Sequence, residues 1–188
     1  AVGSSDLVHD PDGISGEKVA YMLEMRASAR DQVQDFADKF KVQFHAGRRP
    51  WGVKADVALP CATQNELDEN DARELVKNGT ICVCEGANMP TTIGGIKVLQ
   101  EAGVLYSPGK ASNAGGVATS GLEMSQNSMR LPWGKVEVDQ RLHQIMTNIH
   151  RMCLETAEKY AVPGNYMIGA NIAGFLKVAD AMMDQGLV

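Results

Sequence analysis

The sequence contains no long uncharged apolar run and no cluster of basic residues. The first absence excludes a transmembrane helix, which needs about 20 consecutive apolar residues. The net charge of −5 and the pI of about 5.4 argue against a nucleic acid or an anionic membrane surface as the main partner. The first residues, AVGSSDLVHDPDGI, lack a basic segment followed by an apolar run, so we expect no signal peptide.

Cysteine is scarce, and the four cysteines do not have the spacing of a metal site. Cys82 and Cys84 stand two apart in TICVCEG, whereas a zinc site uses a C-x-x-C pair with matching partners elsewhere. On a strand, this spacing places both thiols on one face. We therefore expect no metal, and we interpret all the cysteines, Cys61 and Cys153 included, as reduced and buried in a cytoplasmic protein.

The glycine-rich phosphate loop of dinucleotide-binding folds, G-x-G-x-x-G, is also absent. That loop normally follows the first strand of such a sheet. Residues 1–2 are apolar and resemble the end of a strand, with no earlier strand before them. We therefore expect a sheet that starts at its second strand and lacks the pyrophosphate site.

The 188 residues show short apolar runs that alternate with helical patterns, and they suffice for one domain with a sizeable core. Strands are predicted at 41–46, 55–61, 80–86 and 104–108. The 55–61 run, ended by Pro60, is expected to be buried. Helices are predicted at 17–40, with Ser15 as its N-cap, at 65–79, at 91–103, at 136–159 and at 168–185.

This alternation predicts an α/β fold, a partial Rossmann-like, doubly wound parallel sheet followed by long C-terminal helices. We assign residues 1–130 to a partial dinucleotide-binding domain without its first strand and phosphate loop. Residues 131–188 form the C-terminal helices, which are expected to return toward the cleft.

Three polar segments follow three of the predicted strands: PCATQNE, EGANMPTT and SPGKASNAGGVATSG. The carboxyl ends of parallel strands lie at one edge, which is where ligands bind in such sheets. The segments carry amides and hydroxyls and few charges. Such groups orient a neutral polar ligand, for example a carboxamide or a ribose.

The third segment is crowded with small residues from Ala111 to Gly121. Gly115, Gly116 and Gly121 allow a ligand to approach the backbone closely. Ser120 is expected at a helix start, where free N–H groups favour an anion such as a carboxylate. Tight packing of small residues explains this stretch about equally well when it is taken alone.

Other candidate residues have simpler explanations. His143 and His150 are seven apart on one helix, which is not a metal-binding spacing, so both are read as structural or surface residues. Lys110 is either an anion ligand or an ordinary loop lysine. Trp51 and Trp133 are read as anchors of their loops.

Taken together, several motifs resemble the C-terminal part of the small, hexameric glutamate dehydrogenases. The motifs are LPCATQNELD, EGANMPTTI, SPGK, NAGGVATSGLEMSQN, RLHQIMTNIH and GANIAGFLKVADAM. The resemblance extends over nearly the whole chain. Leucine and phenylalanine dehydrogenases share this architecture but resemble the motifs less well.

The resemblance implies reversible oxidative deamination of L-glutamate to 2-oxoglutarate and ammonia, with NAD or NADP as the cofactor. It places Thr63 and Gln64 beside the nicotinamide, Asn88 at the nicotinamide ribose and Asn113 at the carboxamide. It also implies that Gly116, Val117 and Ser120 face the substrate, with Ser120 donating a hydrogen bond to the glutamate side-chain carboxylate. The EGANMP and GGVATSG motifs look more like those of the NADP-using members.

The same resemblance locates the catalytic lysine and aspartate in a domain whose motifs are absent here, so we expect no catalytic residue in this chain. The chain alone is expected to be inactive, and a hexamer is expected for the complete family protein. Two alternatives stay open: a non-catalytic module that binds nucleotide or pairs with another chain, and a leucine- or phenylalanine-type dehydrogenase.

Overall fold

The computed structural model describes residues 6–29 and 32–186, and the chain divides into two compact units between Val53 and Lys54. The expected division near residue 130 stays a prediction. The predicted end of a strand at residues 1–2 lies outside the described residues.

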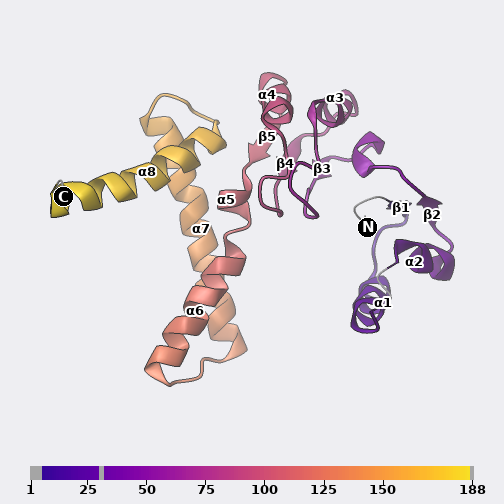
Figure 1. Ribbon diagram of the computed structural model, residues 1–188, viewed down its shortest axis with the longest axis horizontal. Coiled ribbons are helices and arrows are strands. Elements are labelled where there is room, and N and C mark those ends of the chain that lie inside the picture. The colour runs from indigo at the N-terminus through magenta and orange to yellow at the C-terminus, as the bar shows by residue number, and fades with distance from the viewer. Residues whose placement is uncertain (1–5, 30–31, 187–188) are drawn as a thin grey trace. The chain divides into compact units, whose positions relative to one another are not determined.

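The first unit consists of two short strands, two helices and one 3-10 turn (Figure 1). In chain order these are β1 (Leu7–His9), α1 (Gly16–Ala27), α2 (Val33–Phe40), β2 (Gln43–His45) and η1 (Pro50–Gly52). β1 pairs antiparallel with β2, which places Val8 opposite Phe44. The strand predicted at 41–46 is thus confirmed, whereas no strand was predicted where β1 lies.

The core of the first unit forms where α1 and α2 pack against β1. Val8, Met25, Phe36 and Ala37 are buried there. Tyr21 and Phe40 stack edge to face beside them, with their ring centroids 5.5 Å apart. Aromatic pairs in this geometry contribute beyond their buried area, so this cluster is the main apolar support of the unit.

The single helix predicted at 17–40 is wrong, because α1 ends at Ala27 and α2 begins at Val33. Ser28 ends α1: its hydroxyl donates to the carbonyl of Met25 at 2.9 Å, and Ala29 has a left-handed φ of 59°. A serine hydroxyl that bonds a nearby backbone carbonyl competes with helix continuation. The predicted N-cap is confirmed, since the side chain of Ser15 accepts from the Lys18 N–H.

The second unit contains a three-stranded parallel sheet in the order β3-β4-β5, as the α/β prediction requires. Its strands are β3 (Val57–Ala58), β4 (Cys82–Cys84) and β5 (Leu105–Ser107). Helices α3 (Glu69–Lys77) and α4 (Ile93–Glu101) connect them and lie side by side (Figure 1). Ala58, Val83 and Tyr106 lie opposite one another in the register and are all buried.

The other face of this sheet is partly bare, so the prediction that the 55–61 strand is buried is wrong. Val57 is 48% exposed and Leu105 is 65% exposed, and both lie in one row with Cys82. Alternation along a strand sends neighbouring side chains to opposite faces. Here only the face with Ala58, Val83 and Tyr106 is covered.

The helices predicted at 65–79 and 91–103 are confirmed as α3 and α4, although α3 begins at Glu69, four residues later than predicted. Asp68 caps α3 through a capping box with Asp71, and Thr92 caps α4 by accepting from Gly95 N–H. Gly79 and Gly103 follow the two helices with φ values of 81° and 75°. These conformations suit glycine and turn the chain into the next strand.

Four further helices follow β5: α5 (Gly109–Ser112), α6 (Gly115–Met129), α7 (Lys135–Lys159) and α8 (Tyr166–Gln185). α6 and α7 form a hairpin, and α7 packs against α8 (Figure 1). Gly169 of α8 lies against α7, where an added Cβ would come within 2.1 Å of the Cys153 carbonyl oxygen. The absence of a side chain there therefore sets the separation of the two helices.

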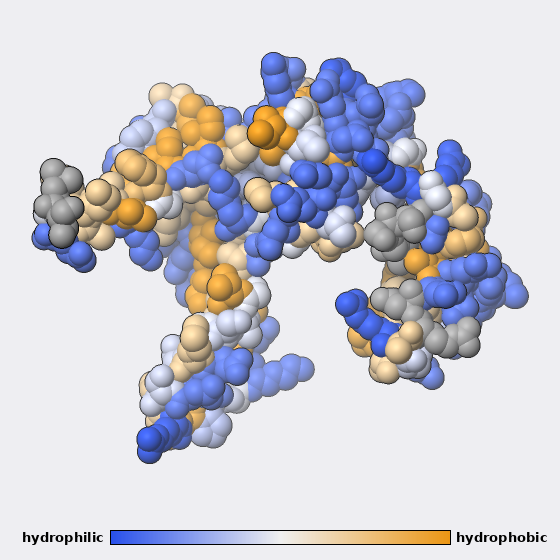
Figure 2. Space-filling view, in the orientation of Figure 1, coloured by the Kyte–Doolittle hydropathy of each residue, from blue (hydrophilic) through white to orange (hydrophobic). Residues whose placement is uncertain are grey.

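Apolar side chains remain exposed on α8, where much of the visible helix surface is apolar in Figure 2. They include Phe175 and Val178, at 68% and 58% exposure. Across residues 6–29 and 32–186, we find no helix with both the length and the apolar composition that crossing a membrane requires.

Replacing Gly169 with alanine should weaken the packing of α7 on α8. The new methyl group meets the Cys153 carbonyl oxygen, so the helices must move apart, at an expected cost of about 1–3 kcal/mol. Gly174→Ala is the matched control on the same helix, because an added Cβ there meets nothing within 4 Å. That control should be neutral or gain up to about 1 kcal/mol in helix propensity. Urea unfolding followed by helical circular dichroism measures both, and equal midpoints would contradict the packing argument.

Asp10 should make the first unit sensitive to acid. Its side chain is 4% exposed and accepts from Lys18 Nζ at 2.5 Å, and this hydrogen bond lowers the pKa of Asp10 below its ordinary value. A lowered folded-state pKa contributes stability above the unfolded pKa, and this stability is lost as the pH falls through the folded pKa. Asp10→Asn should therefore destabilise the unit at pH 7, and the difference from wild type should shrink below about pH 4.

The measurement is thermal unfolding followed by Trp51 fluorescence in a Trp133→Phe background, since Trp51 is the tryptophan of the first unit. Asp12→Asn serves as the control, because Asp12 is exposed and the change keeps its backbone N–H, which donates to Asp10 Oδ1 at 3.2 Å. A difference between Asp10→Asn and wild type that is the same at pH 7 and pH 3 would refute the linkage.

Candidate functional site

Backbone hydrogen bonds join the segments after β3 and β4 at the carboxyl edge of the sheet. The N–H groups of Gly86 and Ala87 donate to the Pro60 carbonyl at 2.9 and 3.0 Å. Farther out, Asn65 N–H donates to the Met89 carbonyl at 3.0 Å. The predicted gathering of these two segments at one edge is thus confirmed.

The segment after β5 is joined to the same edge through side chains. Ser112 Oγ donates to the Glu85 carbonyl at 2.5 Å. Asn113 Nδ2 donates to the Ala87 carbonyl at 3.2 Å and to Asn88 Oδ1 at 2.8 Å. Two of the predicted cofactor residues, Asn88 and Asn113, therefore lie in direct contact.

Glu85 lies beneath this contact, at the end of β4. Its side chain is 3% exposed, and its carboxylate accepts from Tyr106 Oη at 2.7 Å, Gly109 N–H at 2.7 Å and Thr91 N–H at 3.3 Å. Burial, together with the hydrogen bond to Glu85, raises the pKa of Tyr106, so its phenol stays a donor at neutral pH. The carboxylate is enclosed by donors and has no access to a ligand.

Thr63 and Gln64 are both exposed, in the loop between β3 and α3. The loop folds on itself, since Ala62 N–H donates to Glu66 Oε1 at 2.8 Å. It leaves Thr63 and Gln64 exposed at the carboxyl edge. They share an edge with the asparagine pair but are not part of the contact between the amides.

Ser120 does not lie at a helix start, so that expectation is wrong. α6 begins at Gly115, and the Ser120 hydroxyl donates back to the Gly116 carbonyl at 3.3 Å. An interior helical residue has its own N–H bonded within the helix, and in the first turn the Gly116 N–H donates to the Asn113 carbonyl at 3.4 Å. Gly116, Val117 and Ser120 are all exposed on α6.

Lys110 of α5 points its ammonium group at Asn171 Oδ1 of α8. This contact ties the last helix to the segment that carries Asn113. Lys110 is exposed, and a lysine that bonds a side-chain amide has no charged partner in that contact. The choice between an anion ligand and an ordinary loop lysine is not decided by it.

The cysteines, His150 and Trp51 have structural rather than ligand-binding surroundings. All four cysteines are free, and burial raises the pKa of Cys82 and Cys153, which keeps these thiols protonated. The expectation that all four are buried holds for Cys153 alone, because Cys61 is exposed and Cys82 and Cys84 are half-buried. The ring of His150 packs on Tyr166 at 5.6 Å, and Trp51 is buried in its loop.

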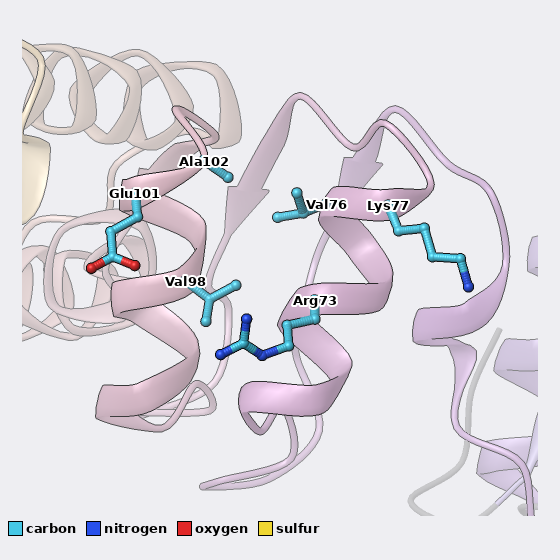
Figure 3. A pocket seen from close by; sticks show the side chains of 6 residues that line it. All are labelled: Arg73, Val76, Lys77, Val98, Glu101 and Ala102. Atoms are coloured by element: carbon cyan, nitrogen blue, oxygen red, sulfur yellow. The ribbon is translucent and has the colours of Figure 1, made fainter.

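A hollow between α3 and α4 lies away from the predicted site (Figure 3). Val76 and Val98 point into it, and Arg73 lies across its mouth. These residues belong to the later halves of the two helices, whereas the carboxyl ends of β3 and β4 lead into the first turns. Arg73 pairs with Glu69 at 2.5 Å, so its charge is already matched on the helix.

The sequence reasoning missed the role of Glu85, although a signal was present. Val83 is on the covered face of β4, and the period of two along a strand places Glu85 on that same face. A carboxylate at a buried position requires hydrogen-bond donors. The donors come from Tyr106, Gly109 and Thr91, in two other parts of the chain.

Residues 1–186 match the Glutamate/Leucine/Phenylalanine/Valine dehydrogenase family. The chain belongs to this family.

Curated relatives align over nearly the whole chain. The NAD-specific glutamate dehydrogenase of Bacteroides fragilis is 55% identical over 187 residues, covering 99% of this chain and 42% of the relative. The NADP-specific glutamate dehydrogenase of Escherichia coli is 53% identical over 188 residues, covering 100% of this chain and 42% of the relative. The chain thus spans about two fifths of the length of these relatives.

Solved structures of the family have the same fold. A glutamate dehydrogenase structure superposes with a TM-score of 0.95 at 52% identity, covering 99% of this chain and 42% of the other. Glutamate dehydrogenase from Plasmodium falciparum gives a TM-score of 0.95 at 40% identity, covering 99% of this chain and 40% of the other. The predicted α/β fold is confirmed.

Proposed function

We propose that this chain is the C-terminal part of a glutamate dehydrogenase, which converts L-glutamate, water and NAD(P)⁺ to 2-oxoglutarate, ammonia and NAD(P)H. Family membership over residues 1–186 supports the reaction class, and relatives at 53% and 55% identity carry the glutamate dehydrogenase name. In this proposal the chain binds cofactor and part of the substrate. The general base belongs to the rest of the protein.

The observation that carries the proposal is the contact between Asn88 and Asn113 at the carboxyl edge of the sheet, 2.8 Å from oxygen to nitrogen. Each side-chain amide has a carbonyl oxygen and an NH₂ group. The contact uses the oxygen of Asn88 and the nitrogen of Asn113. Asn88 keeps its NH₂ group for a ribose hydroxyl, and Asn113 keeps its oxygen for the NH₂ of a carboxamide.

The cofactor would be NAD or NADP, which accepts the hydride from the substrate. Thr63 and Gln64 would border its nicotinamide from the loop after β3. Two motifs look more like those of NADP-using members, but overall sequence identity does not favour NADP. The NAD-specific and NADP-specific relatives are 55% and 53% identical to this chain.

The substrate would lie against the first turns of α6. Gly116 and Val117 present backbone there without a bulky side chain at position 116, and Ser120 presents its hydroxyl one turn later. The hydroxyl is held only by a 3.3 Å bond to the Gly116 carbonyl, so it can turn to a substrate carboxylate. A hydrogen bond to a charged group contributes about 1.5–3 kcal/mol.

The complete protein would be a cytoplasmic homo-hexamer, as the resemblance to the small glutamate dehydrogenases implies. Two alternatives give different outcomes in the experiments below. A leucine- or phenylalanine-type enzyme would use those amino acids in place of glutamate. A non-catalytic module would give no turnover with any of them.

The proposal is tested by restoring the part of the enzyme that the alignment leaves out. We expect a chimera of that part of the Escherichia coli relative with residues 1–188 to reduce NAD⁺ or NADP⁺ in the presence of glutamate. The 188-residue chain alone should give no reduction, because catalysis needs the residues of the missing part. Formation of reduced nicotinamide is followed by absorbance, with leucine and phenylalanine as comparison substrates.

Turnover with leucine or phenylalanine but not glutamate would replace the proposed substrate. A folded chimera without turnover on any of the three would favour the non-catalytic module. Turnover by the 188-residue chain alone would show that a residue of this chain, with Lys110 as the first candidate, acts in catalysis.

Ser120→Ala in the chimera should raise the KM for glutamate about tenfold to a hundredfold while turnover persists, because one hydrogen bond to a charged group is lost. Ser125→Ala is the matched control. Ser125 is exposed on the same helix, and its hydroxyl donates to the Gly121 carbonyl at 2.9 Å in the same i to i−4 pattern. Similar KM values for both variants would remove Ser120 from the substrate site.

A further inference from the structure

We propose that Glu85 is a positioning residue, which fixes Asn88 and Asn113 in the arrangement that binds the cofactor. This inference rests on the proposed function and adds a residue that touches neither cofactor nor substrate. The side chain of Glu85 is inaccessible at 3% exposure, so it acts through the groups it holds.

The donors to Glu85 come from the far side of Asn88 and from the segment that leads to Asn113. Thr91 N–H lies on the far side of Asn88 from Glu85, so one carboxylate oxygen closes the loop 85–91 at 3.3 Å. The other oxygen holds Gly109 N–H at 2.7 Å, at the first residue of α5. Asn113 is the residue that follows α5 as its C-cap. One side chain therefore sets the distance between the two loops that carry the asparagines.

The main chain of Glu85 strengthens the same link. Its carbonyl accepts from Ser112 Oγ at 2.5 Å, and Ser112 is the neighbour of Asn113. Gly109 shows how close the loops lie, because an added Cβ would come within 2.6 Å of the Ala87 carbonyl oxygen and 3.4 Å of Glu85 Oε2. A small rotation of either loop changes the geometry of the Asn88–Asn113 pair.

The donor set explains why a carboxylate stands at this position. Two N–H groups and one phenol converge on it, and an ionised carboxylate accepts at both oxygens and donates at neither. A glutamine of the same shape has one acceptor oxygen and turns an NH₂ group toward the remaining donors. Glu85→Gln therefore removes the hydrogen bond to at least one of these segments without opening a cavity.

The experiment compares Glu85→Gln with Tyr106→Phe in the chimera. Tyr106→Phe is the milder variant, because it deletes one donor and leaves both N–H contacts of the carboxylate in place. We expect the KM for NAD(P)⁺ to rise about tenfold to a hundredfold for Glu85→Gln and by a smaller factor for Tyr106→Phe. The KM for glutamate should change much less. Glu101→Gln is the control, since that side chain is 67% exposed at the end of α4.

A purely structural role makes a different prediction, namely a lower unfolding midpoint with no selective change in the KM for the cofactor. That result would overturn the proposal, as would a parallel rise of both KM values. Thermal unfolding of each variant, followed by circular dichroism, shows whether it is folded at the assay temperature. If Glu85→Gln does not fold, Tyr106→Phe alone decides by the same comparison of KM values.

An inactive wild-type chimera would refute the proposed function and would be visible before any variant is made. In that case amide hydrogen exchange in the 188-residue chain tests the positioning itself. Glu85→Gln should speed exchange at Gly109 and Thr91 while leaving Leu75, in α3, unchanged. Equal exchange at Gly109 and Thr91 in both proteins would show that Glu85 does not hold these loops.

Discussion

The strands of the second unit are too short to fix their own register, so contacts between the loops at their carboxyl ends help to fix it. β3 has two residues, and β4 and β5 have three each. The ladder between such strands contributes few hydrogen bonds. The Pro60 carbonyl, the bridge between Leu67 and Thr91, and the carboxylate of Glu85 add contacts beyond the strand ends. The edge where a ligand would bind is therefore also the edge that holds the sheet together.

There is an energetic reason why one edge can both hold the sheet together and bind a ligand. A buried carboxylate is costly to desolvate, and the cost is offset only when donors surround it. The donors to Glu85 are supplied by the turns that the fold needs after β4 and β5. Meeting the demand of one buried anion thus fixes several turns at once. The polar groups left over, on Asn88 and Asn113, then occupy a rigid support rather than a free loop, as preorganised binding requires.

The sequence predicted the alternation of elements well, because apolar runs, the Ser15 N-cap and the glycines that follow α3 and α4 are local signals. It failed where the deciding contact is distant or small. The break after Ala27 depends on a serine hydroxyl, and β1 depends on a partner more than thirty residues away. The start of α6 was expected near Ser120 but lies at Gly115, because a run of small residues does not mark where a helix begins. The donors of Glu85 were not predicted, because they come from two other parts of the chain.

Cys61 is the one exposed cysteine of the four, and it stands where the loops after β3 and β4 touch. Its sulfur lies 2.4 Å from the position that a Cβ atom on residue 86 would take, so a side chain at that position would collide with the thiol. A thiol-reactive fluorophore would therefore attach at Cys61 in preference to the half-buried Cys82 and Cys84 and the buried Cys153. A dye on Cys61 would lie beside Asn88 and Asn113, and its fluorescence would report the binding of a ligand at this edge of the sheet.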